Sequence, residues 1–352
     1  MQTPIRLAPG LPAVANIRSG RQRARLLILS AGLAALVLLS AVSLIVGAQE
    51  IEPHTAWQAI FSFDSSNNDH LLLRHLRIPR ALLAMVIGCA LGAGGVLMQA
   101  LTRNPLADPG LLGVNAGAAV AIAAAIAGFG VTGISGQLGF GFVGAALAGV
   151  AVYLFGGIRQ GFDPLRMVLA GAALSAVLLA ATQIITINSD NAVFDQFRHW
   201  AVGSLQGRGY AVLGPVAVAT AGGLVLAFAT ARGLDAVALG AELGMVLGAR
   251  PAIVWLSCAT AVVLLAGAAT AAAGPITFVG LIAPHLARHA GGPDHRWQLC
   301  FSMLISAMLV LAADVLGRVI ARPDEISVGI LSALIGGPVF VALVRRRMLE
   351  VS

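Results

Sequence analysis

The chain has 352 residues, of which 58% are hydrophobic and only 11% are charged, and its mean hydropathy is +0.90. Soluble domains carry roughly 25% charged residues, so this composition excludes an ordinary soluble protein and indicates one that crosses a bilayer. The formal net charge is +7, and all 22 basic residues are arginines. Because the chain has no lysine, it lacks the lysine with which a P-loop binds nucleotide phosphates.

The N-terminal part of the chain is a basic segment, residues 1–25, which we expect to lie in the cytoplasm. The apolar run that follows, to residue 48, is too long for the hydrophobic region of a signal peptide. It therefore predicts an uncleaved first membrane span.

Residues 26–347 are expected to form a single all-α membrane domain, because runs of apolar residues long enough to cross about 30 Å of hydrocarbon recur along this whole range. About ten transmembrane helices are predicted. They lie near residues 26–48, 81–101, 111–128, 137–157, 165–187, 211–231, 251–273, 275–290, 297–319 and 326–344.

The orientation follows from the arginines, which lie in short loops between apolar runs. Ten spans place both termini on the same side of the membrane, and 15 arginines fall on that side against 7 on the other. The positive-inside rule then predicts that both termini are cytoplasmic, in a multi-pass protein of the cell (inner) membrane. The same distribution indicates topology rather than binding to nucleic acid.

Three polar segments interrupt the apolar pattern. Residues 49–80 and 188–210 are predicted on the outer side, and the second contains aromatic residues such as Trp200, which favours a short interfacial helix. Residues 232–250 are predicted on the cytoplasmic side. Their mixed apolar and acidic pattern suits an amphipathic turn on which a soluble partner docks.

No metal or cofactor site is expected. The three cysteines lie far apart in the sequence, which predicts free, buried thiols. His285 and His289 have a spacing that suits zinc and His295 lies nearby, but no glutamate or cysteine completes a ligand set.

The segment over residues 77–115 reads RIPRALLAMVIGCALGAGGVLMQALTRNPLADPGLLGVN. Gly88 and Gly92 form a GxxxG face, so we expect this helix to pack tightly inside the bundle. The Asn-Pro and Asp-Pro pairs that follow force a turn and end the helix.

This segment resembles the signature of the FecCD-type permeases of iron-siderophore, haem and cobalamin ABC importers. Blocks at 274–288 and at 314–340 resemble that family's other motifs, and the order and spacing match from about residue 26 to 347. Members have ten membrane helices, in agreement with the count above. The matching motif residues are Gln99, Asn104, Pro105, Asp108, Pro109, Gly274, Pro275, Phe278, Pro284, His285, Arg288 and Asp314.

The resemblance also implies two docking surfaces. Arg77, Arg80 and Arg318 match positions that pair with glutamates of a substrate-binding protein, although arginines at helix ends also extend to the interface for solvation alone. On the other side, the predicted ATPase coupling residues are Leu239, Gly240, Ala241, Glu242, Leu247 and Gly248. Asp314 stands four residues before Arg318, which predicts an intrahelical ion pair or a hydrogen bond between helices.

The resemblance implies a transport subunit without an ATPase site of its own. Its partners would be a second permease subunit, identical or paralogous, two ATP-binding subunits, and a periplasmic or lipid-anchored substrate-binding protein. The substrate would be a ferric siderophore, because residues 194–205 are most similar to ferric-catecholate permeases such as those for ferric enterobactin. Haem or cobalamin is the alternative substrate.

Two other classes are less favoured. An ion-coupled secondary transporter needs several ionisable residues inside the membrane, and only Asp314 qualifies. An intramembrane enzyme needs a converging set of catalytic residues, and the sequence offers none.

Overall fold

A computed structural model describes residues 12–47, 49–156 and 164–351, and within those ranges it contains helices and no strands. The chain begins with α1 (Pro12–Ile45), α2 (Pro53–Phe61), α3 (Asn68–Leu72) and the π-helical turn η1 (Leu73–Arg77). The chain continues with α4 (Ile78–Thr102), the 3-10 turn η2 (Pro109–Leu112), α5 (Val114–Phe129), α6 (Ile134–Phe155) and α7 (Pro164–Ile187). The second half comprises α8 (Asn191–Ala201), α9 (Tyr210–Ala238), α10 (Ala241–Val246), α11 (Pro251–Ala273), α12 (Val279–Gly291), α13 (His295–Ile320) and α14 (Val328–Val351).

The prediction of about ten membrane helices is confirmed, since a helix coincides with each predicted span. Seven helices of the described chain are long and apolar enough to cross a membrane, and α5 and the first part of α14 are shorter apolar helices. The eighth predicted span, 275–290, is represented by α12, which has only 13 residues. At about 1.5 Å per residue it reaches roughly 20 Å, less than the thickness of the hydrocarbon.

Three predicted boundaries differ from the structure. Helix α1 begins at Pro12, inside the segment 1–25, whose first 11 residues lie outside the described residues. Helix α4 follows α3 and η1 without a break, so this helical stretch starts before residue 81. Helix α9 continues to Ala238 because its last turns still pack into the bundle, and the turn predicted over 232–250 is therefore shorter.

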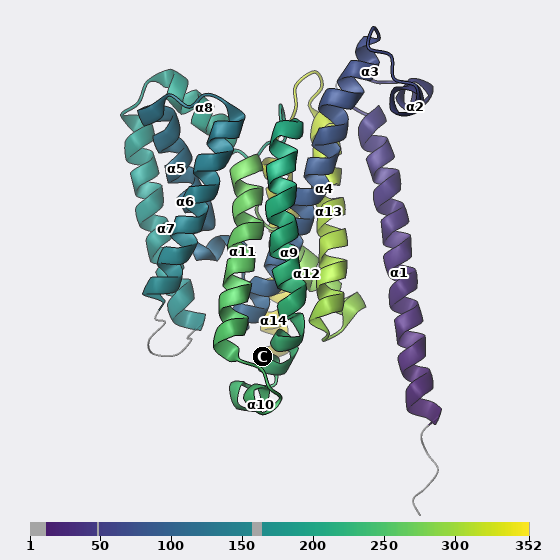
Figure 1. Ribbon diagram of the computed structural model, residues 1–352, viewed down its shortest axis with the longest axis vertical. Coiled ribbons are helices and arrows are strands. Elements are labelled where there is room, and N and C mark those ends of the chain that lie inside the picture. Colours follow the sequence, from purple (N-terminus) through teal and green to yellow (C-terminus); the bar gives the residue numbers. More distant parts are fainter. Residues whose placement is uncertain (1–11, 48, 157–163, 352) are drawn as a thin grey trace, which may run out of the picture.

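The helices are arranged around α4, which packs against α9, α11, α12 and α13. Figure 1 shows α5, α6, α7 and α8 gathered on one side of this centre and α1 standing at the opposite edge. Helices α2, α3 and α8 lie at one end of the bundle, which we call the outer end. Helix α10 lies at the other, inner end, where α1 begins and the chain ends.

The two polar segments predicted for one side of the membrane are thus found at the same end of the bundle. The short helix predicted within 188–210 is present as α8, and Trp200 is its buried side chain. An aromatic side chain at that position anchors the connection between α7 and α9 against the bundle.

Helices α4 and α13 form the most extensive contact in the fold, and small residues explain why. The predicted GxxxG face packs directly on α13: a Cβ added at Gly88 would lie 2.5 Å from the Cα of Ala307. Ser302 Oγ donates a hydrogen bond of 2.8 Å to the carbonyl oxygen of Gly92. Without side chains at these glycines the two backbones approach closely, as is common between membrane helices.

We expect Gly88→Ala to destabilise the protein, because the new methyl group meets backbone atoms of α13 that cannot move aside. Overpacking of this kind costs about 1–3 kcal/mol. Gly222→Ala in α9 is the matched control, since a Cβ there has no neighbour within 4 Å and alanine favours the helix. Thermal unfolding in detergent measures both, and an unchanged midpoint for Gly88→Ala would contradict the close contact.

Candidate functional site

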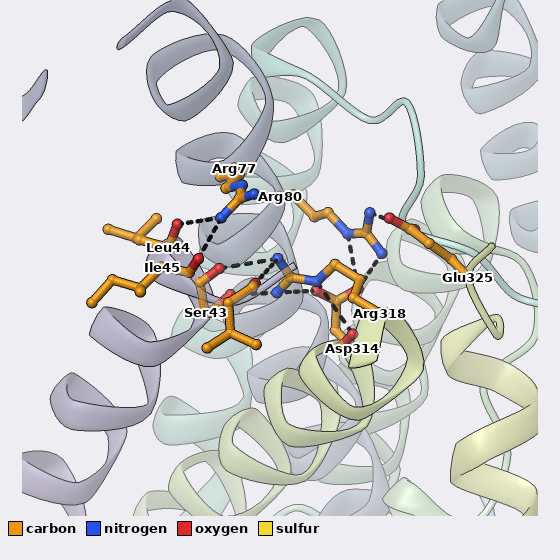
Figure 2. A network of polar contacts seen from close by, with 9 residues as sticks. Ser43, Leu44, Ile45, Arg77, Arg80, Asp314, Arg318 and Glu325 are labelled. Carbon is orange, nitrogen blue, oxygen red and sulfur yellow. Dashed lines mark hydrogen bonds and ion pairs between the residues drawn. The ribbon is translucent and has the colours of Figure 1, made fainter. Parts of the chain in front are cut away.

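The first candidate site lies at the outer end, where the end of α1, the start of α4, the end of α13 and the following loop meet (Figure 2). Five charged side chains converge there. We call this set the outer network, and it consists of Arg77, Arg80, Asp314, Arg318 and Glu325.

Asp314 lies at the centre of the outer network and is fully buried. Arg80 donates to its Oδ1 from Nε at 2.9 Å, and Arg80 Nη2 lies 2.8 Å from the same oxygen. Arg318 Nη2 lies 3.0 Å from Oδ2, within ion-pair distance although not aligned as a hydrogen bond. The predicted pairing of Asp314 with Arg318 is therefore confirmed, and a second arginine from α4 joins it.

Arg80 also bridges to the loop after α13, where its Nη1 lies 2.8 Å from Glu325 Oε2. Sequence reasoning missed Glu325, because 245 residues separate it from Arg80 and no periodicity connects them. Its position seven residues after Arg318, in a short polar loop, is a signal too weak to identify it.

Arg77 closes the end of α1. It donates from Nη1 to the carbonyl oxygens of Leu44 at 2.7 Å and Ile45 at 2.9 Å, and from Nη2 to that of Gln49. The last carbonyls of a helix have no partner within the helix and form the negative end of its dipole. A buried guanidinium satisfies both needs.

Arg318 meets the same helix end from the other side. Its Nη1 donates to the carbonyl oxygens of Ser43 at 3.0 Å and Val46 at 3.1 Å, and its Nη2 donates to the Ser43 hydroxyl at 2.7 Å. These contacts hold α1, which is otherwise largely exposed, against α13 at the outer end.

The structure thus brings together the three arginines predicted to dock a binding protein, at the predicted end of the bundle. It also places their guanidinium groups inside the chain: Arg318 is 3% exposed and Arg77 7%, and all three already have partners. In this conformation they do not present free charges, so a direct clamp would require them to exchange partners.

The arginines of the outer network line an outer cavity of about 310 Å³. Glu325 and the loop between α8 and α9 complete its wall, and that loop contributes a fourth arginine, Arg208.

The second family block begins with the short non-helical segment that connects α11 to α12. Gly274 has φ +77° and a Cβ there would strike the carbonyl oxygen of Trp200, so the position requires glycine. Pro275 follows it, and Phe278 precedes the first residue of α12 with φ +66°, while its ring centroid lies 6.0 Å from that of Phe340 in α14. Pro284 lies inside α12.

The first family block ends in the turn between α4 and α5. Asn104 Oδ1 accepts a hydrogen bond of 3.0 Å from the amide of Leu106, and Pro105 lies between these two residues in the sequence. Asp108 Oδ1 accepts from the amide of Gly110 at 2.8 Å and so caps η2, whose first residue is Pro109. The predicted turn is confirmed, and its side chains satisfy backbone amides.

The remaining motif residues gather at the inner end. Gln99 Oε1 accepts from Arg288 Nη2 at 2.7 Å, and Gln99 Nε2 donates to the carbonyl of Leu281 at 3.2 Å. The amide therefore ties α4 to α12. His285 and His289 contact one another edge to face at 5.3 Å, and the described residues contain no group of three or more metal-binding side chains.

A further pair at the inner end was not expected. Asp235 of α9 accepts from the backbone amide of His295 at 3.1 Å and lies 2.5 Å from its Nδ1. The carboxylate holds the end of α9 against the first residue of α13.

The predicted coupling residues form a compact turn that projects from the inner end (Figure 1). Leu239 follows α9, Gly240 has φ +116° and Gly248 has φ +85°, so glycines enclose the turn at both ends. Ala241 and Glu242 begin α10.

The turn exposes apolar side chains, which is unusual for a free surface. The exposed residues are Leu239, Leu243, Met245, Val246 and Leu247, and Val246 is 84% exposed. Sequence reasoning identified the turn and two of these leucines but missed Val246, because its exposure depends on how α10 folds back on α9.

The three cysteines are free, as predicted; Cys258 is buried and the other two are half-buried.

Comparison with known proteins identifies this architecture. The family model of the FecCD transport family matches residues 12–346. The chain belongs to the FecCD transport family. It is 43% identical over 318 residues to the ferric enterobactin transport system permease protein FepD of Escherichia coli (strain K12), covering 89% of this chain and 93% of that protein.

Two further relatives support the assignment to the FecCD family. The hemin transport system permease protein HmuU of Yersinia pestis is 38% identical over 336 residues, covering 94% of this chain and 98% of that protein. A solved inward-facing structure of a metal-chelate type ABC transporter matches with a TM-score of 0.77 at 28% identity, covering 91% of this chain and 99% of that one.

In this FecCD chain we expect Asp314→Asn to lower stability strongly, because Arg318 would remain buried without its counter-ion and Arg80 would keep only Glu325. Breaking a buried pair in this way costs about 3–5 kcal/mol. Arg322→Gln is the control: it removes an exposed ion pair with Glu50, 2.7 Å long, which is worth about 0–1 kcal/mol. Equal unfolding midpoints for the two variants would rule out a structural role for Asp314.

Proposed function

We propose that the chain is the membrane permease subunit of a binding-protein-dependent ABC importer for ferric siderophores in the cell inner membrane. One observation carries the proposal: 43% identity over nearly the full length to a ferric enterobactin permease, with no large part of either chain left unmatched. A hemin permease at 38% identity supports haem as the second candidate substrate.

The chain supplies a pathway and not bond chemistry. It has no lysine for a P-loop, so ATP is hydrolysed by two partner subunits on the cytoplasmic side. A second permease subunit, identical or paralogous, completes the membrane part. No resident cofactor is required for this role.

The exposed apolar turn around α10 is the proposed contact with the ATPase. Five neighbouring apolar side chains in water are unfavourable unless another protein covers them, and the excess of arginines in the loops of this end supports a cytoplasmic location for it. A short helix that inserts into a groove is a common mode of recognition.

The outer end, around the outer network, is the proposed docking face for a periplasmic or lipid-anchored substrate-binding protein. The arginines that line the outer cavity outnumber the carboxylates beside them, and this local excess of positive charge would attract an acidic group of a partner. The internal pairs of Arg77, Arg80 and Arg318 keep the helix ends that form the face in register.

The proposal is tested by uptake into proteoliposomes that contain the assembled transporter and its binding protein. Radioactive iron carried by enterobactin should accumulate only when ATP is present on the side of the membrane that carries the ATPase subunits. A proton gradient alone should not drive accumulation. Uptake of haem but not of the ferric chelate would favour the second substrate. Uptake driven by an ion gradient without ATP would overturn the assignment.

We expect Val246→Asp to abolish ATP-driven uptake, because a carboxylate would be buried without a partner in the ATPase groove. The cost is on the order of several kcal/mol, enough to weaken subunit association more than 100-fold. Val246→Thr keeps the shape of the side chain and should retain most activity. Co-purification of the ATPase with the permease and proteoliposome uptake measure both effects, and normal values for Val246→Asp would exclude α10 from the interface.

A further inference from the structure

The outer cavity contains one guanidinium group that has no partner among the residues that the structure describes. Arg77, Arg80 and Arg318 are satisfied by carbonyl oxygens or carboxylates, as described above. Arg208 lines the same cavity, is 7% exposed, and its guanidinium has no hydrogen bond or ion pair with the described residues; its Nε is fully buried. Glu325 is the one acidic side chain among the described residues that line the cavity, and it already forms an ion pair with Arg80.

The loop that carries Arg208 is held firmly, so the side chain is positioned rather than free to turn away. The amide of Ser204 donates to the carbonyl of Ala273 at 2.7 Å, and the amide of Gly329 donates to the carbonyl of Gly203 at 2.9 Å. Leu205 is fully buried in the core. These contacts fix the loop to the ends of α11 and α14.

Burial of Arg208 without a counter-ion is unfavourable for its charged form. The loss of hydration lowers the pKa of its guanidinium to about 10, which still leaves the group protonated at neutral pH. A protonated group therefore remains in a partly dehydrated site, where an anionic oxygen would restore the interactions that it has lost.

We propose that the outer cavity is a binding site for a carboxylate group, with the guanidinium of Arg208 as its principal contact. A guanidinium and a carboxylate match in geometry as well as in charge, because two parallel N–H donors meet two oxygens. The three neighbouring arginines add positive potential without needing to leave their partners. A volume of about 310 Å³ is at the lower end of the range for ligand pockets, so the cavity suits one acidic group rather than a large ligand.

The carboxylate has two candidate sources, a small free molecule such as citrate or an acidic side chain of the docked binding protein. The second source rests on the proposed function, and the first does not.

The absence of lysine from the sequence allows a direct test. Arg208→Lys introduces the single lysine of the chain, and its acetylation by a succinimidyl ester is followed by peptide mass spectrometry in the assembled transporter in nanodiscs. Citrate is one probe and the chelate-free binding protein is the other, each compared with sodium chloride at matched ionic strength. Occupancy at ten times the dissociation constant should slow the labelling about tenfold.

Arg322→Lys is the matched control. It also introduces a single lysine at the outer end, but at a position whose side chain is 36% exposed and outside the cavity. Protection at position 208 by citrate identifies a site for small carboxylates, and protection by the binding protein alone identifies a protein carboxylate as the ligand. Equal labelling rates with and without both probes, or equal protection at both positions, would overturn the proposal.

A second measurement covers the case in which Arg208→Lys does not fold. In the unaltered chain, modification of Arg208 by phenylglyoxal is followed by the same peptide analysis, with acetamide replacing acetate as the uncharged control. Slower modification with acetate than with acetamide supports the site, and equal rates contradict it. ATP-driven uptake by the same preparation tests the proposed function separately, so failure of one is distinguishable from failure of the other.

Discussion

A single buried carboxylate organises the outer half of this protein. Asp314 lies inside an apolar helix, where a charge is tolerated only with a partner, and Arg80 and Arg318 both supply one. Arg318 then uses its remaining donors on the last carbonyls of α1, and Arg80 reaches Glu325 in the loop after α13. The outer ends of α1, α4 and α13 therefore cannot separate without leaving a charge buried and unpaired.

The same helices connect this network to the inner end. Close contact at glycines joins α4 and α13 along their length, Gln99 ties α4 to α12, and Asp235 ties the end of α9 to the start of α13. Helix α9 leads directly into the exposed turn around α10. The exposed turn around α10, which is suited to an ATPase, and the outer network, which is suited to a binding protein, thus lie at opposite ends of one continuously packed set of helices.

The helices and one ion pair could be predicted from the sequence alone. Hydrocarbon demands long apolar runs, so all ten predicted spans coincide with helices, and a spacing of four residues revealed Asp314 and Arg318 as neighbours. The other partners could not be predicted, since Glu325 and the carbonyls at the end of α1 meet the arginines only through tertiary packing. For the same reason the sequence singled out three arginines for docking, while Arg208, which lines the same cavity and has no partner among the described residues, is evident only in the structure.

The most direct test of the outer network as an internal tie is a double-mutant cycle between Arg80→Leu and Asp314→Leu, with the free energy of unfolding measured in detergent. Arg80→Leu leaves Asp314 with Arg318 as its one counter-ion, and Asp314→Leu leaves Arg80 with Glu325 alone, whereas the double change removes both members of the pair. We expect the double variant to lose at least about 1 kcal/mol less stability than the sum of the two single losses, within the range found for contacting residues. Losses that add to within about 0.5 kcal/mol would show that the two side chains act independently and would contradict this expectation.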